Sequence, residues 1–129
     1  SIREEVDSAS VLAYWQRSAY RMKENDQKRD DIVTRSVISE LDKAIGIAPN
    51  NAYLYYNRCN AYAAGSDFEK AVEDYTRALE LDPQLAEAYY NRGMSKLKMK
   101  KDTEAVVDLG KAGERGLYKA YSVIKKHSK

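Results

Sequence analysis

The chain has 129 residues, 43% of them hydrophobic and 33% charged, which is material for one globular domain with a continuous core and excludes a disordered chain. Its 22 basic and 20 acidic residues are too evenly balanced for net charge to select a nucleic acid as partner. Charge effects, where they matter, must be local.

The first part of the chain shows helical periodicity in two stretches. Residues 1–11 carry a thin apolar pattern, and we expect an N-terminal extension there. One helix is predicted by a large, a small and a large residue at helical spacing, Trp15, Ala19 and Met22. A second helix is predicted by apolar residues at helical spacing and by the proline that closes it: Val37, Leu41, Ala44, Ile47 and Pro49.

A polar run, residues 23–30, separates these two stretches. The link is about six residues longer than the corresponding link in the next part of the chain. The extra residues form either an extension of the first helix or a loop, and the sequence leaves both open.

Residues 52–85 predict two helices joined by a turn. The break lies at Gly65 and Ser66, and the second helix stops before Pro83, which cannot continue a helix and restricts the residue before it. Two apolar stripes face each other, and small residues within them let the helices approach closely. The stripes are Tyr55, Cys59 and Tyr62 on the first helix and Ala71, Tyr75 and Ala78 on the second.

Residues 86–116 repeat this arrangement imperfectly. Small and apolar residues recur in the same places, but Lys96 replaces an aromatic residue and the closing proline is absent. After Gly113 and Gly116, one more short helix is predicted over residues 117–127, with apolar residues on one face and lysines on the other. We expect this helix to cover the apolar end of the preceding pair.

Identical residues recur at intervals of 34 residues along the chain. They are Pro49/Pro83, Tyr55/Tyr89, Asn57/Asn91, Arg58/Arg92 and Ala71/Ala105, with Ala44, Ala78 and Ala112 as a triple. A period of this length that keeps small and aromatic residues at fixed offsets indicates a stacked array of helix-turn-helix units.

The array resembles the tetratricopeptide repeat (TPR) family, whose units carry a bulky residue at position 4, a small one at 8, aromatics at 11 and 24, alanines at 20 and 27, and proline at 32. Residues 52–85 fit this pattern throughout. The resemblance implies an all-α, right-handed TPR superhelix of three helix-turn-helix repeats plus a C-terminal capping helix. Its parts are a single domain over 1–129, with an extension at 1–11, repeat 1 at 12–51, repeat 2 at 52–85, a degenerate repeat 3 at 86–116 and the capping helix at 117–127.

The resemblance also implies a binding surface, because the first helices of TPR units line a concave groove. The groove positions of the family fall on Gln16, Arg17 and Tyr20 in the first unit, Tyr53, Tyr56, Asn57 and Asn60 in the second, and Glu87, Tyr90, Asn91, Met94 and Lys98 in the third. Tyrosine offers a large contact area at low entropic cost, and an asparagine amide bonds to peptide main chain as donor or acceptor.

We therefore expect a non-enzymatic protein-protein interaction module that binds a peptide or partner helix in this groove, with Tyr56, Asn60 and Tyr90 as the central contacts. The alternative is a structural spacer or self-assembly domain of a longer protein, and self-association is left open. The identity of the partner does not follow from the fold.

One ligand class of the family, the C-terminal tail of chaperones, is held by a carboxylate clamp. The clamp needs Lys and Asn in repeat one, Asn in repeat two, and Lys and Arg in repeat three. This chain has, in that order, Gln16, Tyr20, Asn57, Glu87 and Asn91. Only Asn57 agrees, and Glu87 would repel a carboxylate. We therefore expect a chaperone tail to be disfavoured as ligand.

No residue pattern points to catalysis, a metal or a cofactor. The only histidine, His127, lies in a polar tail, and Cys59 takes a small-residue core position without an activating neighbour. Glycine-rich phosphate loops and metal-ligand spacings are missing from the sequence. The basic clusters at 96–101 and 125–129 lack interleaved aromatic residues, so we interpret them as solvated helix ends and expect no nucleic-acid partner.

Cysteine use and hydropathy leave the location of the protein open. One cysteine excludes an internal disulfide. No stretch approaches the roughly 20 apolar residues that span a bilayer, and no signal-peptide pattern opens the chain. We expect a soluble protein of unknown compartment. Because the sequence begins at Ser1, we also expect a processed chain or a segment of a longer or exported protein.

Overall fold

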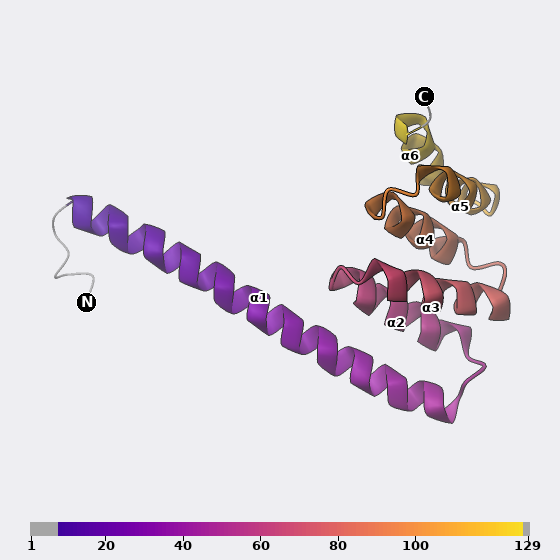
Figure 1. The fold of residues 1–129 in the computed structure, drawn as a ribbon, viewed down its shortest axis with the longest axis horizontal. Helices are drawn as coiled ribbons and strands as arrows, with labels where there is room; N and C mark the ends of the chain where they lie inside the picture. Colours follow the sequence, from indigo (N-terminus) through magenta and orange to yellow (C-terminus); the bar gives the residue numbers. More distant parts are fainter. Residues whose placement is uncertain (1–7, 128–129) are drawn as a thin grey trace. The chain divides into compact units, whose positions relative to one another are not determined.

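The computed structural model describes residues 8–127, with side chains from residue 26 onward. Within this range the chain forms six helices and no strands (Figure 1), which confirms the all-α fold class. The helices are α1 (Ser8–Ile47), α2 (Ala52–Ala64), α3 (Phe68–Leu81), α4 (Ala86–Lys98), α5 (Asp102–Glu114) and α6 (Lys119–His127). Among the residues described, no helix combines the length and apolar character needed to cross a membrane.

The chain divides into two units, Ser1–Val33 and Thr34–Lys129, which we describe separately. In the first unit the backbone from residue 8 onward is helical, and it continues without a break into the second as α1. The second unit contains the rest of α1 and the helices α2–α6, which follow one another in chain order in Figure 1.

Helix α1 differs from the expected first repeat. Residues 12–51 were predicted to hold two helices, yet residues 8–47 form one helix of 40 residues, and the polar run 23–30 lies inside it. The physical reason is local, because no glycine or proline occurs before Gly46 and the polar run is rich in lysine, glutamate, glutamine and arginine, which favour a helix. Of the two alternatives for the inserted residues, the structure contains the helix extension.

Helices α2 and α3 form the hairpin predicted for residues 52–85. The side chain of Asn51 accepts a hydrogen bond of 3.0 Å from the Tyr53 amide at the start of α2, which satisfies one of the free N–H groups there. The two stripes meet in the core, where Cys59, Ala71 and Tyr75 are buried. The small side chains of Cys59 and Ala71 allow the close approach of the two helices.

Helices α4 and α5 repeat this hairpin 34 residues later. The turn residues Ser66 and Lys100 occupy equivalent places and both adopt the left-handed conformation, with φ of 62° and 61°. A Cβ added at Gly93 would lie only 2.9 Å from Cγ of Leu109. The small residue at this position is therefore required by the facing helix, as Cys59 is in the preceding hairpin.

Helix α6 packs on α5 and begins in the same way as α4. The Ala120 amide donates to the Leu117 carbonyl at 3.1 Å, as the Ala88 amide does to the Leu85 carbonyl, and both alanines are fully buried. Helix α6 is thus equivalent to α4 at an offset of 32 residues rather than 34. This equivalence matters for the functional site.

A ladder of ion pairs and one hydrogen bond to a hydroxyl links the first helices α2 and α4 each to two second helices. Arg58 of α2 donates to Asp74 of α3 at 2.7 Å and to Asp42 of α1 at 2.9 Å. The contacts recur 34 residues later, where Arg92 donates to Asp108 at 2.7 Å and to Thr76 at 3.1 Å. The carboxylates of Asp74 and Asp108 are buried, so their charge depends on these arginines.

Two glycines of α5 provide a matched test of how α6 is held. A Cβ at Gly113 would lie 2.4 Å from the ring of Tyr121, whereas a Cβ at Gly110 meets nothing within 4 Å. We expect Gly113→Ala to lower the free energy of unfolding by about 1–3 kcal/mol through overpacking. Gly110→Ala should raise it by about 0.5–1 kcal/mol, because alanine favours a helix. Urea unfolding followed by circular dichroism measures both, and a gain in stability for Gly113→Ala would contradict the packing.

The ladder predicts a large cost for removing one arginine. Arg92→Met leaves the buried Asp108 with only Lys96, at 2.9 Å, as a cationic partner. We expect the free energy of unfolding to fall by about 3 kcal/mol, since an uncompensated charge remains buried. Arg77→Met, which removes an exposed pair with Glu80, is the control and should leave stability unchanged within error. Equal effects of the two substitutions in urea unfolding would rule out the ladder as a stabilising element.

Candidate functional site

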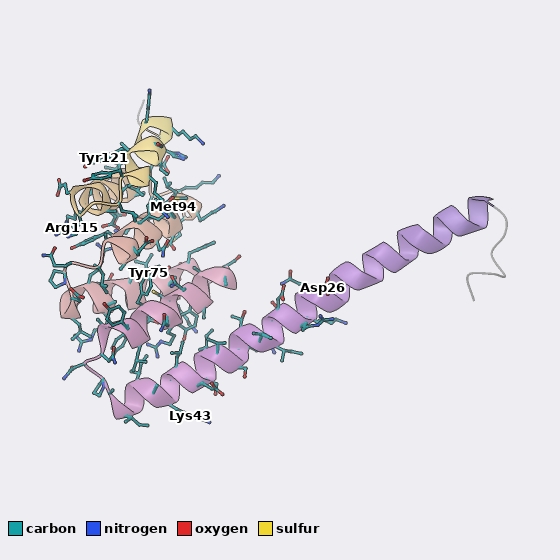
Figure 2. All side chains as sticks on the ribbon, turned by 180° about the vertical axis from the view of Figure 1, so that it is seen from behind. Asp26, Lys43, Tyr75, Met94, Arg115 and Tyr121 are labelled. Carbon is teal, nitrogen blue, oxygen red and sulfur yellow. The ribbon has the colours of Figure 1, made fainter. Side chains whose placement is uncertain are left out.

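A cavity of about 210 Å³ opens between α2 and α4, with its floor on α3. It is lined by Asn60, Ala63, Phe68, Tyr75, Asn91, Met94, Ser95 and Lys98. Figure 2 labels two of these residues, Tyr75 on α3 and Met94 on α4. The lining is mostly apolar, with two amides and one ammonium group, which is the composition of a site that binds an organic ligand in a fixed orientation.

The two asparagines lie side by side in a hydrogen-bond network. The Tyr75 hydroxyl donates to Asn60 Oδ1 at 2.7 Å, and Asn91 Nδ2 donates to the Tyr56 hydroxyl at 3.1 Å and to Asn60 Oδ1 at 3.5 Å. These bonds use neither Asn60 Nδ2 nor Asn91 Oδ1, although the Asn60 side chain also lies within hydrogen-bonding reach of the Tyr56 phenol and lowers its pKa, against the larger effect of burial. The pair therefore presents one donor group and one acceptor, which match the C=O and N–H of a peptide main chain.

One lysine lines the cavity, and a second lies over the ring of Tyr90 on α4. Lys98 lines it and is exposed, and Nζ of Lys119, at the start of α6, lies 4.6 Å from the centre of the Tyr90 ring. A cation over an aromatic face at this distance is attracted to it. Burial raises the pKa of the Tyr56 phenol. The negative charge of the exposed Glu87 raises it further.

Part of the predicted groove comes together around the cavity. Asn60, Asn91, Met94 and Lys98 line it, and Tyr56 joins its hydrogen-bond network. Tyr90 holds the Lys119 ammonium.

Other predicted groove residues lie apart from the cavity lining. Tyr53, Asn57 and Glu87 are exposed and do not line it. The helix α1 includes Gln16, Arg17 and Tyr20, but the side chains of these three residues fall outside what the structure describes.

Three residues of the site were missed from the sequence. Phe68 and Ser95 were not on the groove positions of the family, and Tyr75 was assigned to the core alone. The ring of Tyr75 is buried, but its hydroxyl reaches the groove, and burial raises the pKa of this phenol. The signal that could have found Tyr75 is its hydroxyl group, because a polar group at the end of a buried aromatic side chain needs a hydrogen-bond partner.

The comparisons with known proteins agree with this architecture. A family model described as TPR repeat matches residues 59–100. The chain is 32% identical over 69 residues, 54% of its length, to small glutamine-rich tetratricopeptide repeat-containing protein 2 of Saccharomyces cerevisiae. It spans about a fifth or less of the length of the first curated relatives it matches.

Two solved structures were found in complex with peptides. The first TPR of Spaghetti (RPAP3), bound to the HSP90 peptide SRMEEVD, matches with a TM-score of 0.71 and 25% identity over 96% of this chain and 94% of that one. The second TPR domain of human RPAP3, in complex with the HSP70 peptide SGPTIEEVD, matches with a TM-score of 0.67 and 29% identity over 71% of this chain and 78% of that one.

These complexes correct one of our expectations. Chaperone tails were expected to be disfavoured, and that exclusion is wrong, because similar TPR domains bind such peptides. The exclusion compared Gln16, Tyr20 and Glu87 with the clamp of the family and so assumed that residues 12–51 form the first hairpin. Since those residues up to Ile47 belong to a single helix, that count of units does not hold.

The buried thiol next to the network gives a pH-dependent test. Burial raises the pKa of Cys59 above the ordinary value of 9.0. Below that value the folded and unfolded states both keep the proton. Above it only the unfolded thiol ionises, so the stability supplied by Cys59 is lost as pH rises. We expect the stability of wild type relative to Cys59→Ala to decline from about pH 8 to about pH 10 in urea unfolding. A pH-independent difference, or native-state thiol labelling at the unfolded rate, would contradict the burial.

Proposed function

We propose that this chain, which carries tetratricopeptide repeats, is a non-enzymatic interaction module that binds the free C-terminal end of a peptide in the groove formed by α2, α4 and α6. The observation that carries the proposal is the pair Asn60 and Asn91 on two successive first helices, with Lys119 at the start of the third. Protein interaction is the general role of the family, and the peptide terminus is our specific assignment.

Counting the units from α2 changes the comparison with the carboxylate clamp. With α2 as the first helix of the first unit, the clamp position assigned above to Tyr20 falls on Asn60, and the position assigned to Asn57 falls on Asn91. The position assigned to Glu87 falls on Lys119, because α6 is equivalent to α4 at an offset of 32. These three residues are the Asn, Asn and Lys that the clamp of the family requires. The two other places are held by Tyr56, where the family has Lys, and by Val123, where it has Arg.

The chemistry of these groups suits a carboxylate better than a neutral chain end. Asn60 Nδ2 and the Lys119 ammonium donate to the carboxylate oxygens, and charge-assisted bonds of this kind are the stronger class. Asn91 Oδ1 accepts the N–H of the terminal peptide unit. The exposed Lys98 favours acidic side chains farther along the peptide.

The apolar part of the cavity gives the second element of recognition. Phe68, Ala63 and Met94 surround a space that accepts a small aliphatic side chain. The peptides in the two similar complexes end in EEVD and so combine acidic residues, a valine and a terminal carboxylate. We infer that peptides of this class are the ligands of this groove.

The binding experiment uses the full chain and a fluorescent SRMEEVD peptide in anisotropy titrations. We expect Asn60→Ala and Lys119→Glu each to weaken binding by about tenfold or more, because each removes a hydrogen bond to a charged group. Asn57→Ala is the matched control, since Asn57 is exposed on the same helix as Asn60 and lies outside the cavity. Amidation of the peptide C-terminus should produce a loss as large as that of Lys119→Glu.

Two outcomes would overturn the assignment. If the amidated peptide binds as well as the free acid, the groove does not recognise a terminus. If Asn57→Ala is as harmful as Asn60→Ala while helicity is unchanged, binding takes place outside the cavity.

A further inference from the structure

Helix α6 is the last helix of the array, and it packs on α5 with one side only (Figure 1). The packed side consists of Leu117, Ala120, Val123 and Ile124. The opposite side, which we call the terminal face, consists of exposed residues: Tyr118, Tyr121, Ser122, Lys125 and Lys126. The terminal face therefore combines aromatic rings with positive charge and contains no carboxylate.

The two tyrosines of the terminal face form one exposed aromatic surface. Their rings stack with the centres 6.5 Å apart and an angle of 19° between the planes. Tyr118 is 74% exposed, and Tyr121, which is labelled in Figure 2, is 47% exposed. Apolar surface that is exposed and contiguous marks a site of interaction, whereas a single exposed ring does not.

The repeat accounts for Tyr121 but not for Tyr118. At the offset of 32 residues, Tyr121 is equivalent to Tyr89, a core residue that α5 covers and that is 8% exposed. Tyr118 is equivalent to Ala86, so an exposed ring stands where the preceding first helix has a small side chain. The packing of the array does not require Tyr118.

Positive charge is concentrated at this end of the second unit. Residues 34–110 contain 10 basic and 12 acidic residues, whereas residues 111–127 contain five basic residues and Glu114 as the one acid. Lysines in the last turn of a helix also offset its dipole, which accounts for Lys125 and Lys126 by themselves. The dipole does not account for the exposed rings beside them. The C-terminal end thus has a positive local field that attracts an anionic surface.

We propose that the terminal face binds the surface of an anionic lipid bilayer. Tyrosine rings occupy the headgroup level of a bilayer, because the ring is apolar and the hydroxyl stays in contact with water. Lysines beside them are attracted to anionic headgroups. This binding goes beyond the recognition of a peptide, since the terminal face lies outside the cavity lining and the ammonium of Lys119 is held over Tyr90.

The chemistry of the terminal face favours lipid over a nucleic acid or an acidic peptide. Its cations are lysines, which act as mobile point charges, and it has no arginine to grip a phosphate or carboxylate in a fixed geometry. The rings of Tyr118 and Tyr121 stack on each other, which leaves no gap for a nucleic-acid base between them. A diffuse negative surface requires neither feature.

Co-sedimentation of the full chain with lipid vesicles tests the proposal. We expect binding to phosphatidylcholine vesicles that contain about 30% phosphatidylserine, and binding weaker by about tenfold or more to phosphatidylcholine alone. Binding to the anionic vesicles should also weaken as the salt concentration rises, because exposed charges are screened.

A pair of charge reversals locates the contact. Lys125→Glu with Lys126→Glu should weaken binding to the anionic vesicles by about tenfold or more, because it reverses the charge of the terminal face. Arg35→Glu with Lys43→Glu is the matched control, since it changes the net charge equally at exposed positions of α1. The control should weaken binding by about threefold at most, the effect of net charge alone.

Tyr118→Ser tests the aromatic part of the contact. We expect binding to the anionic vesicles to weaken by about threefold or more, because apolar surface that enters the bilayer interface is removed. Tyr53→Ser is the control, since it removes a tyrosine that is 61% exposed on α2, and it should bind vesicles as wild type does. Circular dichroism establishes that each variant keeps its helicity.

Several results would overturn the proposal. Binding that does not depend on phosphatidylserine, equal losses for the lysine pair and its control, or wild-type binding by Tyr118→Ser each exclude the terminal face as a lipid contact. If the protein binds a single-stranded dT oligonucleotide and not the vesicles, the face recognises nucleic acid instead. Anisotropy measures the binding of SRMEEVD separately, so either proposal can fail alone.

Discussion

The ion-pair ladder fixes how α2 and α4 are turned, and the cavity between them depends on it. Arg58 and Arg92 each bond to the second helix of their own hairpin and to the second helix before it. In an α-helix, residues two apart point about 200° away from each other. With Arg58 held on the ladder side of α2, Asn60 is directed to the opposite side, where the cavity lies. A rotation of α2 would break the ladder and the amide network together.

The core and the groove are joined through Tyr75. Its ring is buried between α2 and α3, while its hydroxyl holds Asn60 Oδ1 at 2.7 Å. The amide orientation of Asn60 is therefore set by a core residue, not by exposed neighbours. Preorganised polar groups on rigid helices bind a ligand with less loss of conformational entropy than groups on loops. The small residues Cys59 and Gly93 make this arrangement possible, because they allow the helices to come close enough for the network to form.

The sequence was most informative where every signal was local. For residues 52–85 the turn at Gly65, the end before Pro83 and the stripes of Tyr55 and Tyr75 all agreed, and the hairpin is as predicted. Helix α1 could not be predicted in this way, since repeat positions indicated a hairpin while the polar run has no residue that breaks a helix. Tertiary pattern and local propensity disagreed there, and the structure follows propensity.

The equivalence of Lys119 with Glu87 was missed because the period changes. A 34-residue offset pairs Ala86 with Ala120, whereas the hydrogen bonds and burial pair Ala88 with Ala120. The spacing from Ala112 to Ala120 is two residues shorter than the equivalent spacing from Ala78 to Ala88. With the correct offset, Lys119 takes the place of Glu87, and the sign of the charge at that place in the groove changes. A shift of two residues therefore decides whether this place carries the negative charge of Glu87 or the positive charge of Lys119, on which the proposed binding of a carboxylate depends.

The same offset places a lysine at the small-residue position of α6. Lys125 of α6 takes the place of Gly93, where the hairpin has room for no more than a small side chain. A second helix cannot approach α6 there without burying the lysine ammonium, which is costly without a partner. Helix α6 is thus suited to end the array.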